Sequence, residues 1–273
     1  MVLAQDVDDL AARLRQGGDR RRDPAVTALG YRDLGPFLAA LAALLATALV
    51  GFLVFAAASA PAHAKPARQT ATTDNGVSTA ESEYAANSYD GAAAPDSVRF
   101  IDHTATSNLL IVAPHAVNHV RAGQPKEADM YTGGIAEMVA QKTGASVLTT
   151  TGKVSDWGDN WDTRDDEFTR ILRSIPTNVR VLDLHGMADG YGIDESIGLG
   201  PRPTSADQSQ ANRINKSFGS SSAINGAGFA ATSSYTITSF MQKRGHVALQ
   251  LELSRTERER NSVVNDVATA ITK

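Results

Sequence analysis

The feature that most constrains this chain is an uninterrupted apolar segment near its amino terminus. Residues 34–64 contain no Asp, Glu, Lys or Arg, and their core, residues 37–60, is a run of 24 almost entirely apolar residues. A bilayer core of about 30 Å needs about 20 apolar residues at 1.5 Å each. The sequence therefore predicts a transmembrane segment over residues 36–60, preceded by a charged head over residues 1–35.

The charges around this segment predict its orientation. Four arginines at positions 20–32 precede it, whereas only Lys65 and Arg68 follow closely. The positive-inside rule then places the head in the cytoplasm and the rest of the chain outside. We expect a membrane-anchored protein with an extracytoplasmic domain.

Two other interpretations of the apolar segment stay open. Ala62-His63-Ala64 has the small-x-small pattern of a signal-peptide cleavage site, and cleavage would release a secreted protein. Cleaved signals normally have a shorter apolar core of roughly 7–15 residues, which favours the uncleaved anchor. A buried core helix is the third interpretation.

A change of composition follows the apolar segment. Residues 61–96 are rich in Ala, Thr, Ser, Asn, Asp, Gly and Pro, and Val77 is their only large aliphatic residue. So few apolar side chains do not offset the entropy of ordering the backbone. We predict a disordered linker over residues 61–96 and a folded domain over residues 97–273, long enough for one sizeable core.

Apolar runs of strand length alternate with helical patterns in this domain. Because strands that alternate with helices form a layered sheet, the pattern predicts an α/β fold with a mixed central sheet flanked by helices. The predicted strands cover residues 109–113, 147–151, 179–184, 196–199, 235–240 and 247–253. The predicted helices cover residues 131–142, 165–174, 206–217 and 255–271.

Composition excludes several classes of function. The chain has no cysteine and a formal net charge of −4. Without cysteine it holds no disulfide scaffold, no thiolate zinc site and no cysteine nucleophile. The weakly acidic balance argues against nucleic acid as a partner.

Three predicted strands end in residues that ligate metals or move protons. His115 follows the first strand, His185 ends the third, and Glu252 lies near the end of the last. Ligands of open α/β sheets bind at the carboxyl ends of the strands, and two histidines with one carboxylate form the catalytic zinc pattern. Alternatively, the two histidines are ordinary loop residues that bind no metal. Glu252 would then belong to a solvated strand face together with Gln250 and Ser254.

Six segments in fixed order resemble a known family. The match is collinear over about 150 residues and excludes the head, the apolar segment and the linker. The segments read APHAVNHVRAG (113–123), EADMYTGGIAE (127–137), DNWDTR (159–164), VLDLHGMAD (181–189), IDESIGLGP (193–201) and LQLELSRTER (249–258). They resemble the N-formylglutamate amidohydrolase superfamily, whose members are zinc-dependent and related in fold to zinc carboxypeptidases and poly-γ-glutamate hydrolases. The resemblance implies a phosphorylase/hydrolase-like fold.

The resemblance also implies the metal ligands. His115 and His185 correspond to two zinc ligands, and Asp129, before the Tyr-Thr-Gly-Gly segment, to the third. Glu127 competes with Asp129 for this role. Zinc carboxypeptidases instead have a glutamate three residues after the first histidine, where this chain has Asn118.

Further roles follow from the same motifs. Glu252 corresponds to the general base, and Asp183, on the same strand face as His185, is a candidate to orient that ligand. Arginine binds carboxylates in a bidentate manner, so Arg164, Arg121 and Arg255 are candidate contacts for a substrate carboxylate, in that order. A surface ion pair is the alternative for each arginine.

Two remaining features complete the candidate site. His119 is expected to form a loop hydrogen bond or a substrate contact rather than to bind a second metal ion. Trp157 and Trp161 are candidates for one wall of the cleft.

The predicted function is a zinc-dependent hydrolase of amide bonds in N-acyl or γ-glutamyl-type substrates. The expected partners are therefore small or peptide-like substrates that bear a carboxylate. The alternatives are a non-catalytic binding module that keeps the fold, and a zinc carboxypeptidase.

Overall fold

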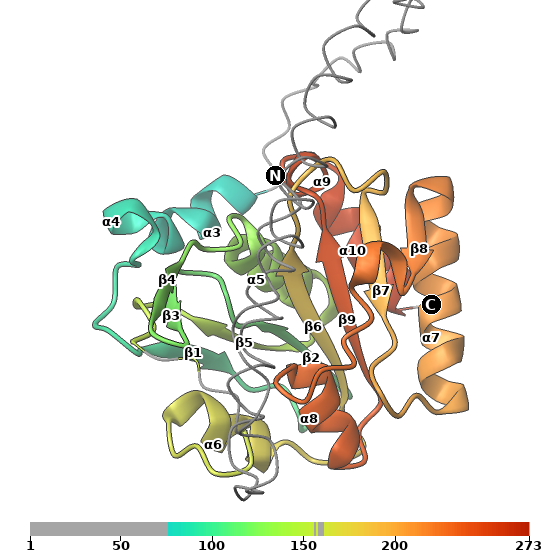
Figure 1. Ribbon diagram of the computed structural model, residues 1–273, viewed down its shortest axis with the longest axis horizontal. Helices are drawn as coiled ribbons and strands as arrows, with labels where there is room; N and C mark the ends of the chain where they lie inside the picture. The colour runs from blue at the N-terminus through green and yellow to red at the C-terminus, as the bar shows by residue number, and fades with distance from the viewer. Residues whose placement is uncertain (1–75, 156, 158–160, 273) are drawn as a thin grey trace, which may run out of the picture. The chain divides into compact units, whose positions relative to one another are not determined.

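A computed structural model describes residues 76–155, 157 and 161–272 (Figure 1). The predicted head, the predicted membrane segment and residues 61–75 of the predicted linker lie outside the described residues. None of the described helices is long and apolar enough to cross a membrane. The helices are α3 (Val77–Tyr84), α4 (Ala86–Tyr89), α5 (Thr132–Thr143), α6 (Glu167–Ser174), α7 (Ser205–Phe218), α8 (Ile237–Lys243), α9 (Arg255–Arg258) and α10 (Val263–Thr272), with short 3-10 turns at Gly219–Ser221 and Gly226–Gly228.

A seven-stranded sheet in the order β1-β5-β2-β6-β9-β7-β8 forms the centre of the domain. β5, β2, β6 and β9 run parallel to one another, β1 is antiparallel to β5, and β7 is antiparallel to β9. β3 and β4 form a separate hairpin. The strands are β1 (Val98–Ile101), β2 (Leu109–Ala113), β3 (His119–Arg121), β4 (Gln124–Lys126), β5 (Ser146–Thr150), β6 (Arg180–Gly186), β7 (Glu195–Gly198), β8 (Ser222–Ile224) and β9 (Ala248–Leu253).

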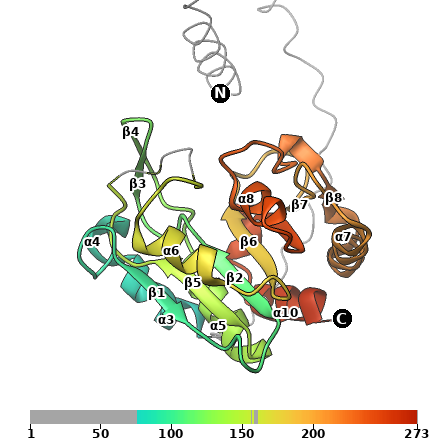
Figure 2. The ribbon, with the colours of Figure 1, turned by 90° about the horizontal axis from the view of Figure 1, so that it is seen from below.

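Helices cover both faces of this sheet, with α5 and α10 on one side and α6 and α8 on the other (Figure 2). α7 packs against α10 and against the β7–β9 side of the sheet. All five residues of β2 are buried, as are all six of β9. Strands buried on both faces read as continuous apolar runs, which explains why the sequence displays them clearly. The predicted α/β class with a mixed, helix-flanked sheet is confirmed.

The predicted strand over residues 235–240 is wrong, because most of this segment belongs to helix α8. The Thr236 side chain caps the helix by accepting a hydrogen bond from the Ser239 backbone N–H. Ile237, Phe240 and Met241 are buried at the three- and four-residue spacing of a helix. A β-branched, aromatic composition suggested a strand, but the cap and the spacing of the buried residues determine a helix.

The predicted single helix over residues 255–271 is two helices, α9 and α10. Ser254 caps α9 by accepting a hydrogen bond from the Glu257 backbone N–H. Asn261 and Ser262 lie in the turn between the two helices. Both residue types form local hydrogen bonds that favour turns and caps over helix interiors.

The predicted disordered linker is wrong for residues 76–96. α3 packs against α5, and the Tyr84 side chain is fully buried. A Cβ atom at Gly133 would lie 2.7 Å from the Tyr84 ring, so this glycine makes room for the ring. The scarcity of aliphatic residues misled the prediction, because one aromatic ring and buried polar contacts dock this segment.

Candidate metal centre

Three side chains from separate segments converge at the carboxyl ends of β2 and β6. His115 follows β2 after one proline, His185 lies near the end of β6, and Asp129 precedes α5. Because β2 and β6 are parallel neighbours, their carboxyl ends meet at the same edge of the sheet. One ligand atom from each of the three residues lies within 4.8 Å of the others. This group can hold a metal ion.

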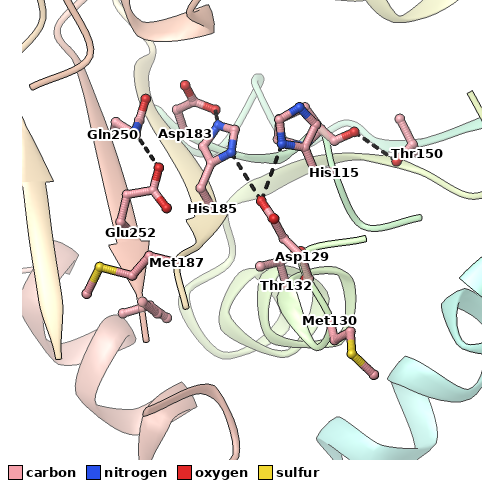
Figure 3. A network of polar contacts seen from close by, with 12 residues as sticks. His115, Asp129, Met130, Thr132, Thr150, Asp183, His185, Met187, Gln250 and Glu252 are labelled. Atoms are coloured by element: carbon pink, nitrogen blue, oxygen red, sulfur yellow. Dashed lines mark hydrogen bonds and ion pairs between the residues drawn. The ribbon is translucent and has the colours of Figure 1, made fainter. Parts of the chain in front are cut away.

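The two histidines face the same oxygen atom. His115 Nδ1 and His185 Nδ1 each lie 3.3 Å from Asp129 Oδ2, as Figure 3 shows. Charge-assisted N–H···O hydrogen bonds are shorter, about 2.7–2.9 Å. Ligand atoms in a tetrahedral zinc site with bonds of about 2.0–2.1 Å lie about 3.3 Å apart. The three side chains therefore fit a zinc ion in type, and both His–Asp129 separations match its spacing.

The second ring nitrogen of His185 has a carboxylate partner. His185 Nε2 lies 3.0 Å from Asp183 Oδ1. Asp183 is fully buried, and its other oxygen accepts hydrogen bonds from the Thr238 backbone N–H at 3.3 Å and the Thr238 hydroxyl at 3.2 Å. A carboxylate behind a ligating histidine fixes the orientation of its ring. Asp183 thus holds His185 with Nδ1 toward Asp129.

Backbone contacts place Asp129 at the site. Its N–H donates to the His115 carbonyl at 2.8 Å, and its carbonyl accepts from the Thr132 hydroxyl at 2.7 Å. The Asn118 side chain has other partners: its Oδ1 accepts a hydrogen bond from the Ala128 N–H at 3.0 Å, and its Nδ2 donates to Asp90 Oδ1 at 2.9 Å. Glu127 is exposed and lies outside the group. The structure therefore brings Asp129, and not Glu127, to the histidines.

The helix that follows Asp129 has a cap from a distant segment. Glu81 of α3 accepts hydrogen bonds from the backbone N–H groups of Tyr131 at 2.6 Å and Gly134 at 2.8 Å. Burial raises the pKa of Glu81 to about 7, although these hydrogen bonds oppose the shift. Glu81 could not be predicted as a cap from the sequence, because local spacing does not reveal a partner some 50 residues away.

Glu252 lies beside His185 on the neighbouring strand. The two residues are paired in the register of β6 and β9, and Figure 3 shows the Glu252 side chain next to His185. Glu252 is 6% exposed, and its Oε1 accepts a hydrogen bond from Gln250 Nε2 at 2.6 Å. Burial raises the pKa of Glu252 to about 7, whereas the charge of His185 acts to lower it. A carboxyl group that titrates near neutrality is suited to accept and return a proton.

The three converging side chains form one electrostatic unit. Burial acts to raise the pKa of Asp129, but hydrogen bonds with both histidines hold it well below its ordinary value. Burial acts to lower the pKa of His185, but the charge of Asp183 and the contacts with both aspartates hold it well above 6.5. For His115, burial and the charge of His185 prevail and lower the pKa. The two aspartates thus favour the protonated form of the His185 ring.

Arg164 lies in an aromatic cluster beside the metal group. The Trp157 ring centroid is 6.4 Å from that of His115, and the Arg164 guanidinium carbon lies 5.3 Å from the Trp157 centroid and 5.8 Å from that of Trp161. Arg164 Nε also donates to Asp166 at 2.7 Å. The structure therefore places Trp157 beside His115 and Arg164 over the Trp157 and Trp161 rings, with the Arg164 guanidinium already engaged by Asp166.

The other two predicted arginines occupy different positions. Arg121 ends β3, and its positive charge acts to lower the pKa of both His115 and His119. Arg255 pairs with Glu259 at 2.8 Å and lies on the exposed side of α9. Arg121 is thus within electrostatic range of the metal group, whereas Arg255 forms a surface ion pair.

His119 packs against the metal group and is not one of its members. Its ring stacks on His115 with centroids 4.2 Å apart and planes at 5°. It is 2% exposed, and neither ring nitrogen has a hydrogen-bond partner within the described part of the chain. Burial lowers the pKa of His119 to about 3, and the expected loop hydrogen bond or substrate contact of this side chain stays a prediction.

Arg258 is a buried residue that sequence analysis missed. Its guanidinium reaches backbone carbonyls on three segments of the site, including that of Met130 next to Asp129. Arg258 lies among alternating charges in the segment RTERER, which reads as a solvated helix face. Its burial, and its hydrogen bonds to carbonyls of distant segments, follow from the fold and are not visible in the local sequence.

Comparisons with known proteins add a likeness in fold. No known protein family matches the chain, and no curated protein matches its sequence. Among solved structures, a bacteriophage poly-γ-glutamate hydrolase aligns with a TM-score of 0.40 and 15% identity, over 64% of this chain and 85% of that one. A gene product of Agrobacterium tumefaciens aligns with a TM-score of 0.37 and 12% identity, over 63% of this chain and 88% of that one.

Proposed function

We propose that this domain is a zinc-dependent hydrolase of amide bonds in carboxylate-bearing substrates of N-acyl or γ-glutamyl type. His115, Asp129 and His185 would hold the ion, and Glu252 would act as general base. The observation that carries the proposal is the convergence of two histidine Nδ1 atoms on one Asp129 oxygen, with a buried glutamate in register beside His185. Three protein ligands leave a fourth position for water or substrate, as in catalytic zinc sites.

In the proposed reaction, a bound ion would activate the water and the carbonyl, and protein side chains would move the proton and hold the groups in place. A bound zinc ion polarises a carbonyl and activates water at neutral pH. Glu252 accepts a proton from the attacking water and returns it to the leaving amine. Gln250 fixes the carboxylate of Glu252 through its 2.6 Å hydrogen bond, while Asp183 keeps His185 in its ligating orientation. Each of these groups is buried or half-buried and needs little rearrangement to act.

Positive charge beside the site supports a substrate with a carboxylate. Arg121 acts electrostatically on His115, and Arg164 lies over the Trp157 ring next to it. Guanidinium groups bind carboxylates strongly and with defined geometry. We infer that Arg121 and Arg164 bind the substrate carboxylate, and that Arg255 contributes at the rim.

A hydrolysis screen of the zinc-loaded protein tests this function. The substrates are N-formyl, N-acetyl and γ-glutamyl amides of glutamate, each compared with the matching amide that lacks the free carboxylate. We expect hydrolysis of at least one carboxylate-bearing amide and a much weaker reaction with its neutral counterpart. Release of C-terminal residues from ordinary peptides would instead indicate a carboxypeptidase, and zinc binding without any hydrolysis would indicate a binding module.

We also propose that the chain is anchored in a membrane by residues 36–60, with the hydrolase domain outside the cytoplasm. The proposal rests on the 24-residue apolar run and on the arginines that precede it. Fractionation of cells should recover the chain with the membranes. Protease added to cells whose outer face is accessible should degrade the domain. An intact, soluble cytoplasmic protein would contradict the proposal, and a mature chain that begins after Ala64 would show a cleaved signal.

A further inference from the structure

Arg258 joins three segments of the protein through one guanidinium group. Its Nε donates to the Met130 carbonyl at 2.8 Å, and its Nη1 donates to the Met187 carbonyl at 3.1 Å and to the Leu253 carbonyl. The side chain is 6% exposed. These three acceptors belong to the loop before α5, the residue that follows β6 and the last residue of β9.

Each acceptor is close in sequence to a residue of the proposed site. Met130 follows Asp129 directly, and Leu253 follows Glu252 directly. Met187 lies two residues after His185. A rigid, planar guanidinium therefore fixes the relative positions of two proposed metal ligands and the proposed base.

The backbone at the end of β6 is shaped to admit this side chain. A Cβ atom at Gly186 would lie 2.4 Å from Arg258 Nη1 and 2.5 Å from its Cζ. Any residue other than glycine at this position would displace the guanidinium or the strand end. The glycine that follows His185 is thus explained by Arg258 and not by a turn.

The charge of Arg258 is balanced from a distance. Within the described residues, no carboxylate forms a hydrogen bond or ion pair with its guanidinium, and all the hydrogen bonds of the guanidinium go to backbone carbonyls. The negative charges of Asp129 and Glu252 nevertheless act on it. A buried cation without such compensation is costly, so its position depends on the acidic site that it supports.

We propose that Arg258 is a positioning residue that sets the spacing of Asp129, His185 and Glu252 for metal binding. This inference rests on the proposed zinc site, and it assigns Arg258 no contact with substrate. Arg258 contributes through its hydrogen bonds to the three carbonyls and through its positive charge, which offsets the negative charges of Asp129 and Glu252.

Zinc affinity of the full chain, measured by competition with a chromophoric chelator, tests this role. Loss of a group that orients metal ligands typically weakens metal binding by about 10–100-fold, and we expect a loss of this size for Arg258→Ala. Guanidinium chloride at low, non-denaturing concentration should restore part of the affinity by filling the vacated space, whereas sodium chloride at equal ionic strength should not. Arg244→Ala is the matched control, because Arg244 also donates to a backbone carbonyl, that of Arg173, and is exposed.

The outcomes separate this inference from the proposed function. If the wild-type protein binds no zinc, the proposed site itself is wrong. If the wild type binds zinc and Arg258→Ala binds it within twofold of the wild type, or if Arg244→Ala shows an equal loss, the positioning role is overturned. Circular dichroism of the zinc-free proteins checks folding, and where the alanine variant does not fold, Arg258→Lys is judged by the same twofold criterion.

Discussion

The two ends of the parallel strands β2, β6 and β9 differ in chemistry. At the carboxyl end, His115, His185 and Glu252 are brought together, and the histidines share one oxygen of Asp129. At the amino end, mostly apolar side chains such as Ile214, together with Arg180 and Gln210, line a cavity of about 10 Å³, about the space of one water molecule. One set of strands therefore carries reactive groups at one end and tight packing at the other.

One acid at each end, the buried Asp207 and the half-buried Asp129, shows what this difference means. Asp207, near the amino end, accepts hydrogen bonds from the Thr204 N–H and hydroxyl and from the Ala248 N–H, so backbone and hydroxyl donors satisfy it. Asp129, at the carboxyl end, instead faces two titratable rings. Asp207 is therefore structural, because fixed donors satisfy it. Asp129 is available for a ligand, because its partners are rings that can lose their protons.

Loss of the proposed base should have the largest effect. Glu252→Gln removes the proton acceptor but keeps the shape and the contact with Gln250, so we expect hydrolysis to fall by about 10²–10⁴-fold. Zinc content and the unfolding midpoint should change little. Steady-state kinetics provide the measurement, with exposed Glu167→Gln as the control, and an unchanged rate would remove Glu252 from the mechanism.

Packing at the amino end should affect stability and spare metal binding. Ile214 is fully buried, so we expect Ile214→Ala to lower the free energy of unfolding by about 2–5 kcal/mol. The smaller truncation Ile214→Val should cost about 0.5–1.5 kcal/mol. Denaturant unfolding of the zinc-free protein measures both. The contrast between the two ends would be contradicted if Ile214→Val weakened zinc binding as much as His185→Ala, a variant of the carboxyl end.

Glu81 should make stability depend on pH in an unusual direction. Its pKa is raised from 4.5 to about 7 by burial, so the folded protein holds this proton more tightly than the unfolded chain. Its contribution to the free energy of unfolding is therefore complete below about pH 4.5 and is lost as the pH rises through about 7, by about 3 kcal/mol in all.

The Glu81→Gln variant isolates this contribution. The stability of the wild type relative to the variant should fall between about pH 4.5 and 7 and stay level outside this range. Denaturant unfolding of both proteins at several pH values measures it. A relative stability that rises with pH would show that the ionised carboxylate, bound by the Tyr131 and Gly134 N–H groups, is the favoured form.

The cap of α7 should have the smallest effect. Thr204 and Asp207 form a reciprocal capping box at the start of this helix. Thr204→Ala should cost about 1 kcal/mol of stability, with no change in zinc affinity, whereas Thr204→Ser should cost less because it keeps the hydroxyl. Thermal unfolding of the two variants measures the difference. Equal costs for alanine and serine would show that the hydroxyl bond does not stabilise the helix.

Much of the sheet could be predicted from sequence because its strands are buried on both faces. Leu109–Ala113 reads as a continuous apolar run and is β2 with the same bounds. The polar residues after such runs are conspicuous, which is why His115 and His185 could be selected. Their meeting with Asp129 needed the family resemblance, because Asp129 lies in a loop that has no periodic pattern.

The missed elements depend on contacts that are distant in sequence. α3 docks through Tyr84 and Glu81 onto the glycines of α5, and no local pattern near residue 80 signals this partner. Arg258 was hidden among surface-like charges for the same reason, since its acceptors include Met130, 128 residues away. Local sequence predicts elements well where burial repeats with a period, and poorly where one side chain joins separate segments.

Zinc titration of the purified protein, beside Asp129→Ala and His185→Ala, tests whether these side chains form a zinc site. We expect one tightly bound zinc ion per wild-type chain and severe loss of binding in both variants, with Glu127→Ala retaining the wild-type affinity. A wild-type chain without stoichiometric zinc, or variants that bind it as tightly as the wild type, would show that His115, Asp129 and His185 are not a zinc site.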